Sequence, residues 1–120
     1  MNLGPRLPLV WSPTYEVDIG AHVFPTAKYR LVRETLLKVG IAGESEFIEP
    51  DPPTWEVVGS AHSNLYLEKI RNGTLSIREQ LTLEVPFTPA LREASLLCCG
   101  GTLLTARMAL EQGVAVHLGG

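Results

Sequence analysis

Few of the features that identify a function at sight are found in this sequence. Its two cysteines, Cys98 and Cys99, are adjacent, so the chain lacks a disulfide framework and the spaced Cys and His ligands of a zinc motif. We interpret both as small side chains buried in a helix. The net charge of −3 lacks the basic excess of nucleic-acid-binding proteins, so we expect no nucleic-acid partner.

Long hydrophobic runs are also missing. No apolar stretch approaches the about 20 residues that cross a bilayer, and the N-terminus lacks the apolar segment of a signal peptide. We therefore expect a soluble, intracellular protein with no membrane partner. The cytoplasm is the first expectation, and a nucleus or organelle is left open. A content of 45% hydrophobic and 19% charged residues over 120 residues is typical of one globular domain.

Short apolar segments alternate with segments of helical periodicity. The predicted strands cover residues 7–11, 46–49 and 114–118, and the predicted helices cover residues 26–39, 54–60, 63–71, a short stretch from 76, and 89–112. Thr26 is the predicted cap of the first helix, and residues 12–25 are a predicted loop. This order predicts an α/β fold with a mainly parallel sheet.

The last predicted helix is apolar on nearly every side. Thr88 followed by Pro89 is a strong start signal, and Gly113 is a plausible end. A helix without a polar face is expected to be buried on most sides. Gly100 and Gly101 weaken a helix interior, so their presence indicates close backbone packing against a neighbour. Three short strands offer too little surface to bury a helix of this length. The sequence therefore predicts about half of a sheet.

The three histidines form no metal-ligand pair by spacing. His117 lies in the last apolar strand and is interpreted as a buried histidine whose ring is hydrogen-bonded. His22 lies in the long polar loop and is the best single functional candidate. The sequence contains no nucleophile elbow and no phosphate-binding loop, so residue chemistry alone predicts no complete active site.

Four ordered segments nevertheless match a known pattern. They are GAHVFPTAKYRL at residues 20–31, VGSAHSNLYL at 58–67, the helix around GGT within 94–109, and AVHLGG at 115–120. Together they resemble the N-terminal part of the zinc-dependent histone deacetylase superfamily, which includes acetoin-utilisation and acetylpolyamine amidohydrolase types. The resemblance implies an arginase/deacetylase-type fold, with a mainly parallel sheet and flanking helices, of which residues 1–120 form a single incomplete domain.

The resemblance also implies a chemistry. Intact members hydrolyse the amide of acetyl-lysine or of a small acetylated amine with a zinc-activated water. In the family the glycine turn continues into a His-His pair, and the zinc ligands and a tyrosine come later. The chain stops before all of them. We therefore expect no catalytic residue, no metal ligand and no cofactor in this chain, zinc in the intact family, and no hydrolysis by this chain alone.

Four peripheral residues carry over from the family pattern. His22 matches a histidine near the substrate entrance, although Val23 stands where many members have proline. Lys28 matches an arginine that lines an internal pocket, with a one-residue shift and without arginine's planar fork. Gly119 and Gly120 match glycines in the wall of the acyl channel, where a side chain would block the substrate.

Two alternatives to a truncated enzyme stay open. The chain could be a non-catalytic scaffold or interaction module that pairs with a deacetylase or with a separate C-terminal half. It could also be an unrelated small α/β domain. In each case a buried-type helix and strand without neighbours predict self-association through exposed apolar surface.

Overall fold

A three-stranded parallel sheet lies at the centre of the computed structural model, which describes residues 7–21 and 24–120. The strands are β1 (Leu9–Val10), β2 (Phe47–Ile48) and β3 (Val116–His117), in the order β2-β1-β3. Leu9 pairs with Phe47 on one side and with Val116 on the other. The expected α/β class and parallel pairing are confirmed, although each strand is only two residues long.

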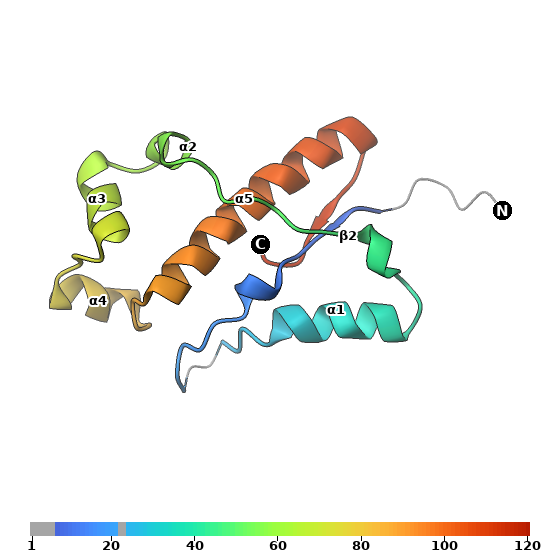
Figure 1. Ribbon diagram of the computed structural model, residues 1–120, viewed down its shortest axis with the longest axis horizontal. Helices are drawn as coiled ribbons and strands as arrows, with labels where there is room; N and C mark the ends of the chain where they lie inside the picture. The colour runs from blue at the N-terminus through green and yellow to red at the C-terminus, as the bar shows by residue number, and fades with distance from the viewer. Residues whose placement is uncertain (1–6, 22–23) are drawn as a thin grey trace.

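Two helices cover opposite faces of this sheet (Figure 1). The helix α5 (Pro89–Gln112) packs on β1, on β3 and on η1 (Pro13–Tyr15), a short 3₁₀ helix that follows β1. The helix α1 (Lys28–Lys38) lies on the other side and also contacts η1. A second short 3₁₀ helix, η2 (Glu44–Glu46), leads directly into β2.

Three short helices lie to one side of the sheet, between β2 and α5 (Figure 1). They are α2 (Trp55–Gly59), α3 (Asn64–Asn72) and α4 (Ile77–Leu83). Each begins close to its predicted start and is capped by a side chain: the side-chain oxygens of Thr54, Ser63 and Ser76 each accept a backbone N–H three residues on. These bonds satisfy amides that a helix leaves unpaired at its first turn, which is why the sequence located all three starts.

The predicted cap of α1 is wrong. Ala27 is the N-cap and makes no side-chain cap bond, because the Thr26 hydroxyl is bonded elsewhere. It accepts from the Val17 amide at 3.0 Å and donates to the Val17 carbonyl at 2.6 Å. Thr26 thus closes the loop before α1 and is not available to cap the helix.

The bounds of α5 are confirmed, but its expected burial is wrong. Only Ala94, Gly100 and Gly101 are buried, whereas Leu103 and Leu110 are 44% and 89% exposed. The helix touches the sheet along one side, whereas the side that carries Leu103 and Leu110 is left exposed. For the same reason the cysteines are less buried than expected: Cys98 is half-buried and Cys99 is exposed.

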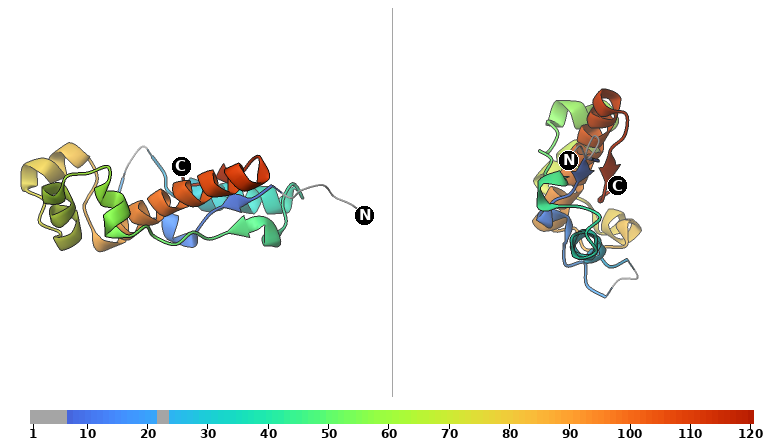
Figure 2. Two further views of the ribbon diagram at one scale, coloured as in Figure 1. Left: turned by 90° about the horizontal axis from the view of Figure 1, so that it is seen from above. Right: turned by 90° about the vertical axis from the view of Figure 1, so that its right-hand side faces the viewer.

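The molecule is thin and extended for its length (Figure 2). Its extents are 57 × 33 × 16 Å and its radius of gyration is 16.4 Å, against about 13.6 Å for a compact domain of this size. Within residues 7–21 and 24–120 the buried apolar core is Leu9, Val10, Tyr15, Ala42, Leu75 and Ala94. In this described part of the chain no helix has the length and apolarity needed to traverse a bilayer.

Candidate functional site

A hydrogen-bonded chain of three side chains lies where α5 crosses the carboxyl ends of β1 and β3. Tyr15, in η1, is 1% exposed, and its hydroxyl lies 2.8 Å from Nε2 of His117 in β3. The hydroxyl of Thr102, in α5, lies 3.2 Å from Nδ1 of the same ring. Both ring nitrogens of His117 therefore have a partner, which confirms that its ring is hydrogen-bonded, although the residue is half-buried and not fully buried as expected.

Burial determines the protonation states of Tyr15 and His117. Desolvation lowers the pKa of His117, so its ring is neutral at pH 7. Burial is the main cause that raises the pKa of Tyr15, so its hydroxyl keeps its proton at pH 7. In a neutral ring one nitrogen donates and the other accepts; one arrangement that satisfies this has Tyr15 donating to Nε2 and Nδ1–H donating to the Thr102 oxygen. These hydrogen bonds orient the His117 ring, and the three side chains together carry no charge.

Two glycines allow the three segments to meet. A Cβ added to Gly101 would lie 2.3 Å from both His117 Nε2 and the Tyr15 hydroxyl oxygen. A Cβ added to Gly119 would lie 2.3 Å from Cε2 of the Tyr15 ring. Each distance is far below van der Waals contact, so only glycine fits at either position. The expected close approach of the helix backbone is confirmed, also at Gly100, where a Cβ would lie 2.0 Å from the Asp51 carbonyl oxygen.

The glycine turn thus rests directly on the Tyr15 ring. Gly119 is buried, whereas Gly120 is exposed, and a Cβ on Gly120 would lie 3.2 Å from His117 Nδ1. The turn follows the carboxyl end of β3, and η1 follows the carboxyl end of β1. In parallel α/β sheets this edge is where ligands bind, because the loops from neighbouring strands converge there.

An apolar hollow opens beside the turn. It has a volume of about 420 Å³, and its lining includes Tyr15, Val17, Thr26, Tyr29, Cys98 and Gly119. Burial, together with the neighbouring Cys99, raises the pKa of the Cys98 thiol to about 11, so the thiol is uncharged at pH 7. The hollow has room for a small uncharged group and offers it few hydrogen-bond partners.

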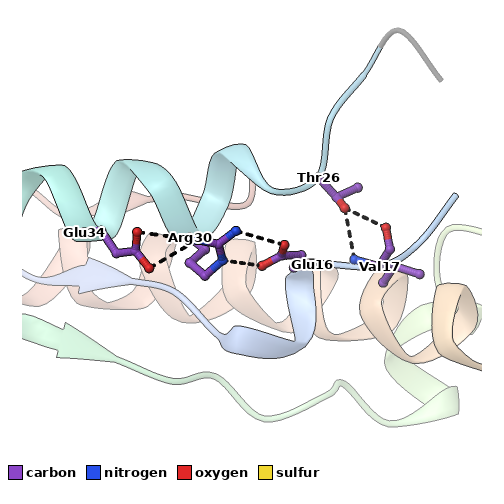
Figure 3. Close-up of polar contacts among 5 residues, drawn as sticks. All are labelled: Glu16, Val17, Thr26, Arg30 and Glu34. Atoms are coloured by element: carbon purple, nitrogen blue, oxygen red, sulfur yellow. Dashed lines mark hydrogen bonds and ion pairs between the residues drawn. The ribbon is translucent and has the colours of Figure 1, made fainter. Parts of the chain in front are cut away.

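The loop that contains the candidate His22 is closed by polar contacts at its base (Figure 3). Thr26 bonds to Val17 across the loop, and Arg30 of α1 donates to Glu16 at 2.8 Å and to Glu34 at 3.2 Å. These carboxylates raise the pKa of Arg30. His22 itself lies outside the described residues, so its predicted role stays a prediction.

Lys28 is exposed at the start of α1. Its Nζ lies 3.9 Å from the centroid of the Phe24 ring and 5.2 Å from that of Tyr29, and both rings line the hollow. The ammonium therefore packs on the outer side of two lining residues. The structure brings Gly119 and Gly120 together with His117. Lys28 does not touch this group and lies outside the hollow, behind Phe24 and Tyr29.

Sequence reasoning missed Tyr15 and Thr102. Tyr15 was part of a polar loop without periodicity, and its burial depends on β3, which lies about a hundred residues away. The only local signal is Ser12, whose hydroxyl accepts from the Thr14 amide at 3.2 Å and starts η1. Thr102 belongs to the helix segment that carries the family resemblance, but nothing in the pattern indicates a histidine partner.

The described part of the chain contains no set of side chains that could bind a metal ion. Among residues 7–21 and 24–120, no three His, Cys, Asp or Glu side chains lie close enough together to hold an ion. These residues therefore do not fit a zinc site by themselves.

Two curated proteins are similar to nearly the whole chain. An uncharacterised protein of Picosynechococcus sp. is 32% identical over 114 residues, which cover 94% of this chain and 38% of that protein. Histone deacetylase 2 of Arabidopsis thaliana is 26% identical over 125 residues, which cover 96% of this chain and 32% of that protein. The chain thus spans only about a third of the length of each relative. No protein-family model matches it.

Proposed function

We propose that this chain forms the glycine-turn part of a zinc-dependent deacylase, which hydrolyses the amide of acetyl-lysine or of a small acetylated amine. The observation that carries the proposal is the similarity of nearly the whole chain to a protein named histone deacetylase 2. The resemblance of the four ordered segments points the same way. In this proposal the three parallel strands and their two covering helices belong to an arginase/deacetylase-type sheet.

The chain's own contribution would be to shape the acyl channel. Gly119 lies against the buried Tyr15 ring with no room for a Cβ, and Gly120 is exposed beyond it. A channel wall made of backbone leaves space for an acyl chain and presents peptide groups that can bond to it. The apolar hollow next to the turn would exclude water from that end of the channel.

His117 would act as a positioning residue. Its neutral ring is fixed by Tyr15 on one side and by Thr102 on the other, and it supports the turn from below. In this role it neither transfers a proton nor binds metal. When bound, zinc in such enzymes polarises the acyl carbonyl and activates a water, and the ligands would come from residues outside those described here.

The two remaining candidates are His22 and Lys28, and we propose for Lys28 a place other than the internal pocket that the family pattern implies, because this residue is exposed. Lys28 lies on the outer face of Phe24 and Tyr29, where its charge can attract an acidic or polar part of a substrate. His22 keeps its predicted role near the substrate entrance.

A chimera tests the proposal. This chain replaces the matched segment of the Picosynechococcus protein in one continuous polypeptide, and acetate release from an acetyl-lysine peptide and from acetylated diamines is measured with and without a zinc chelator. We expect chelator-sensitive release, reduced at least tenfold by Gly119→Val. Gly43→Ala is the control, because a Cβ there meets only a flexible side-chain oxygen at 3.8 Å. A chimera that melts cooperatively and binds zinc but releases no acetate from either substrate would overturn the proposal.

A further inference from the structure

A second hollow lies away from the glycine turn, among α2, α3, α4 and the first half of α5, where the three short helices gather (Figure 1). It has a volume of about 160 Å³. An apolar protein cavity of about 150 Å³ is large enough to bind benzene, so the second hollow has room for a single six-membered ring. Leu91 and Ser95 of α5 line both this hollow and the one beside the turn, so the helix separates the two.

Aromatic side chains form much of the wall of the second hollow. Trp55 of α2, Tyr66 of α3 and Phe87, between α4 and α5, all line it. His62 also lines it, with its ring centroid 5.5 Å from that of Tyr66. Aromatic walls bind a flat ring through offset-stacked and edge contacts, in addition to the gain from burying its surface. The size and the lining therefore favour an aromatic ring over an inorganic ion or a polar chain.

A cation without a carboxylate partner lies in the same wall. Arg92 of α5 lines the hollow and donates from Nη1 to the Arg71 carbonyl at 2.9 Å, which holds its guanidinium in place. No carboxylate pairs with Arg92 within residues 7–21 and 24–120, and the described lining contains neither Asp nor Glu. A second guanidinium, that of Arg71, lies 5.3 Å from the Trp55 ring centroid. The wall thus combines a ring-sized apolar space with positive charge, and a guanidinium can form two parallel bonds to one carboxylate.

We propose that the second hollow binds a small aromatic carboxylate, with its ring among Trp55, Tyr66 and Phe87 and its carboxylate on Arg92. The ring displaces water from apolar side chains, and the carboxylate supplies the negative partner that Arg92 lacks among the described residues. Binding here requires no hydrolysis at the glycine turn, so the site is independent of the proposed function.

An apolar side chain of another polypeptide, including a second copy of this chain, is the competing occupant. Such a side chain could fill the hollow, but it would cover the Arg92 guanidinium without giving it a negative partner. Burying an unpaired charge is costly, and a ligand that carries its own carboxylate avoids this cost. The charge of the wall therefore favours the aromatic carboxylate.

Calorimetric titration of the full 120-residue chain with benzoate tests this, with benzamide and acetate as comparison ligands. Benzamide has the same ring without the charge, and acetate has the charge without the ring. We expect saturable binding of benzoate and at least tenfold weaker binding of either comparison ligand, because each loses one of the two contacts. A tenfold change corresponds to about 1.4 kcal/mol. This comparison requires no variant.

Two arginine variants of α5 separate the site from the overall charge. Arg92→Gln should weaken benzoate binding at least tenfold and change benzamide binding less than twofold. Arg107→Gln is the matched control, because it removes the same charge from an exposed position on the same helix, about 22 Å further along. It should change benzoate binding less than twofold.

Alkylation of Cys99 locates the bound ligand. Cys99 is exposed and lines the second hollow, so saturating benzoate should slow its reaction with a maleimide at least threefold, as followed by mass spectrometry. If circular dichroism shows that Arg92→Gln does not fold, Cys99→Phe replaces it; this change places a ring in the hollow, keeps Arg92 and should weaken benzoate binding at least tenfold.

Four results would overturn the proposal. They are benzamide binding as tight as that of benzoate, equal weakening by the two arginine variants, and benzoate binding that leaves the Cys99 rate unchanged. The fourth is a chain that forms dimers on a sizing column and binds no benzoate, which would assign the hollow to a second copy.

Discussion

Replacing Gly119 by alanine tests the packing of the turn on Tyr15. The φ angle of Gly119 lies outside the left-handed region, so alanine is allowed by the backbone and the whole effect is steric. The new Cβ would lie 2.3 Å from Cε2 and 2.5 Å from Cδ2 of the ring. Carbon atoms pack at about 3.5 Å or more, so the ring must retreat by about 1 Å.

The Tyr15 ring has little freedom to retreat. It is 1% exposed and lies in edge contact with Tyr29, at 5.8 Å between centroids, and with His117, at 5.5 Å. Overpacking of this kind costs about 1–3 kcal/mol. A shift of about 1 Å also breaks the 2.8 Å bond to His117 and leaves a buried hydroxyl unpaired, at a further cost of about 1–3 kcal/mol. The unfolding free energy should therefore fall by about 2–6 kcal/mol.

Urea unfolding followed by circular dichroism measures this loss. Gly59→Ala is the control, because its Cβ would lie 3.5 Å from Leu67 Cδ1, an ordinary contact, and alanine favours a helix by about 0.5–1 kcal/mol. In a Tyr15→Phe background, Gly119→Ala should cost less, because the hydrogen bond is already gone. A loss below about 0.5 kcal/mol for Gly119→Ala, or the same loss in both backgrounds, would refute the reasoning.

The same contacts make three other outcomes measurable. The pKa of His117 is lowered in the folded chain, so its contribution to stability is full above the unfolded pKa of about 6.5 and is lost as the pH falls below that value. The urea midpoint should therefore drop between pH 8 and 5.5. A His117→Gln chain whose midpoint drops by the same amount would contradict this. Thr88→Ala removes the bond that its hydroxyl accepts from the Leu91 amide at 3.1 Å and should cost about 1 kcal/mol, and an unchanged midpoint would speak against the cap. Because the pKa of Cys98 is raised to about 11 and Cys99 is exposed, a maleimide should label Cys99 first at pH 7.5, and mass spectrometry that finds Cys98 labelled first would exclude this order.

Local signals predicted the helices of this chain well. Thr54, Ser63, Ser76 and Thr88 each cap the helix that follows them, because a cap bond involves only residues three apart. Thr26 shows the limit of such signals. Its hydroxyl meets Val17 nine residues away, and nothing in the local pattern distinguishes that bond from a cap.

The candidate site depended on long-range contacts and was predicted only in part. The cost of Gly100 and Gly101 in a helix interior predicts close packing, and the structure supplies the neighbours. Gly119 and Gly120 are singled out only by the family pattern, which does not indicate the contact of Gly119 with Tyr15. Tyr15 could not be found, since its burial requires α5 and β3 together. The exposure of Leu110 was also missed, because an apolar helix alone does not reveal how many of its sides have a neighbour.

The bond between Tyr15 and His117 also constrains the order in which the chain can fold. It joins residues that are 102 positions apart, so the strand that carries His117 leaves the ribosome long after Tyr15 does. Until then the Tyr15 hydroxyl has no acceptor, and α5 has one strand fewer to pack on. Closing a loop of this length is entropically costly and slow. During synthesis the apolar surface of α5 is therefore exposed for the whole time that the central contact is missing, and chaperones can bind it then.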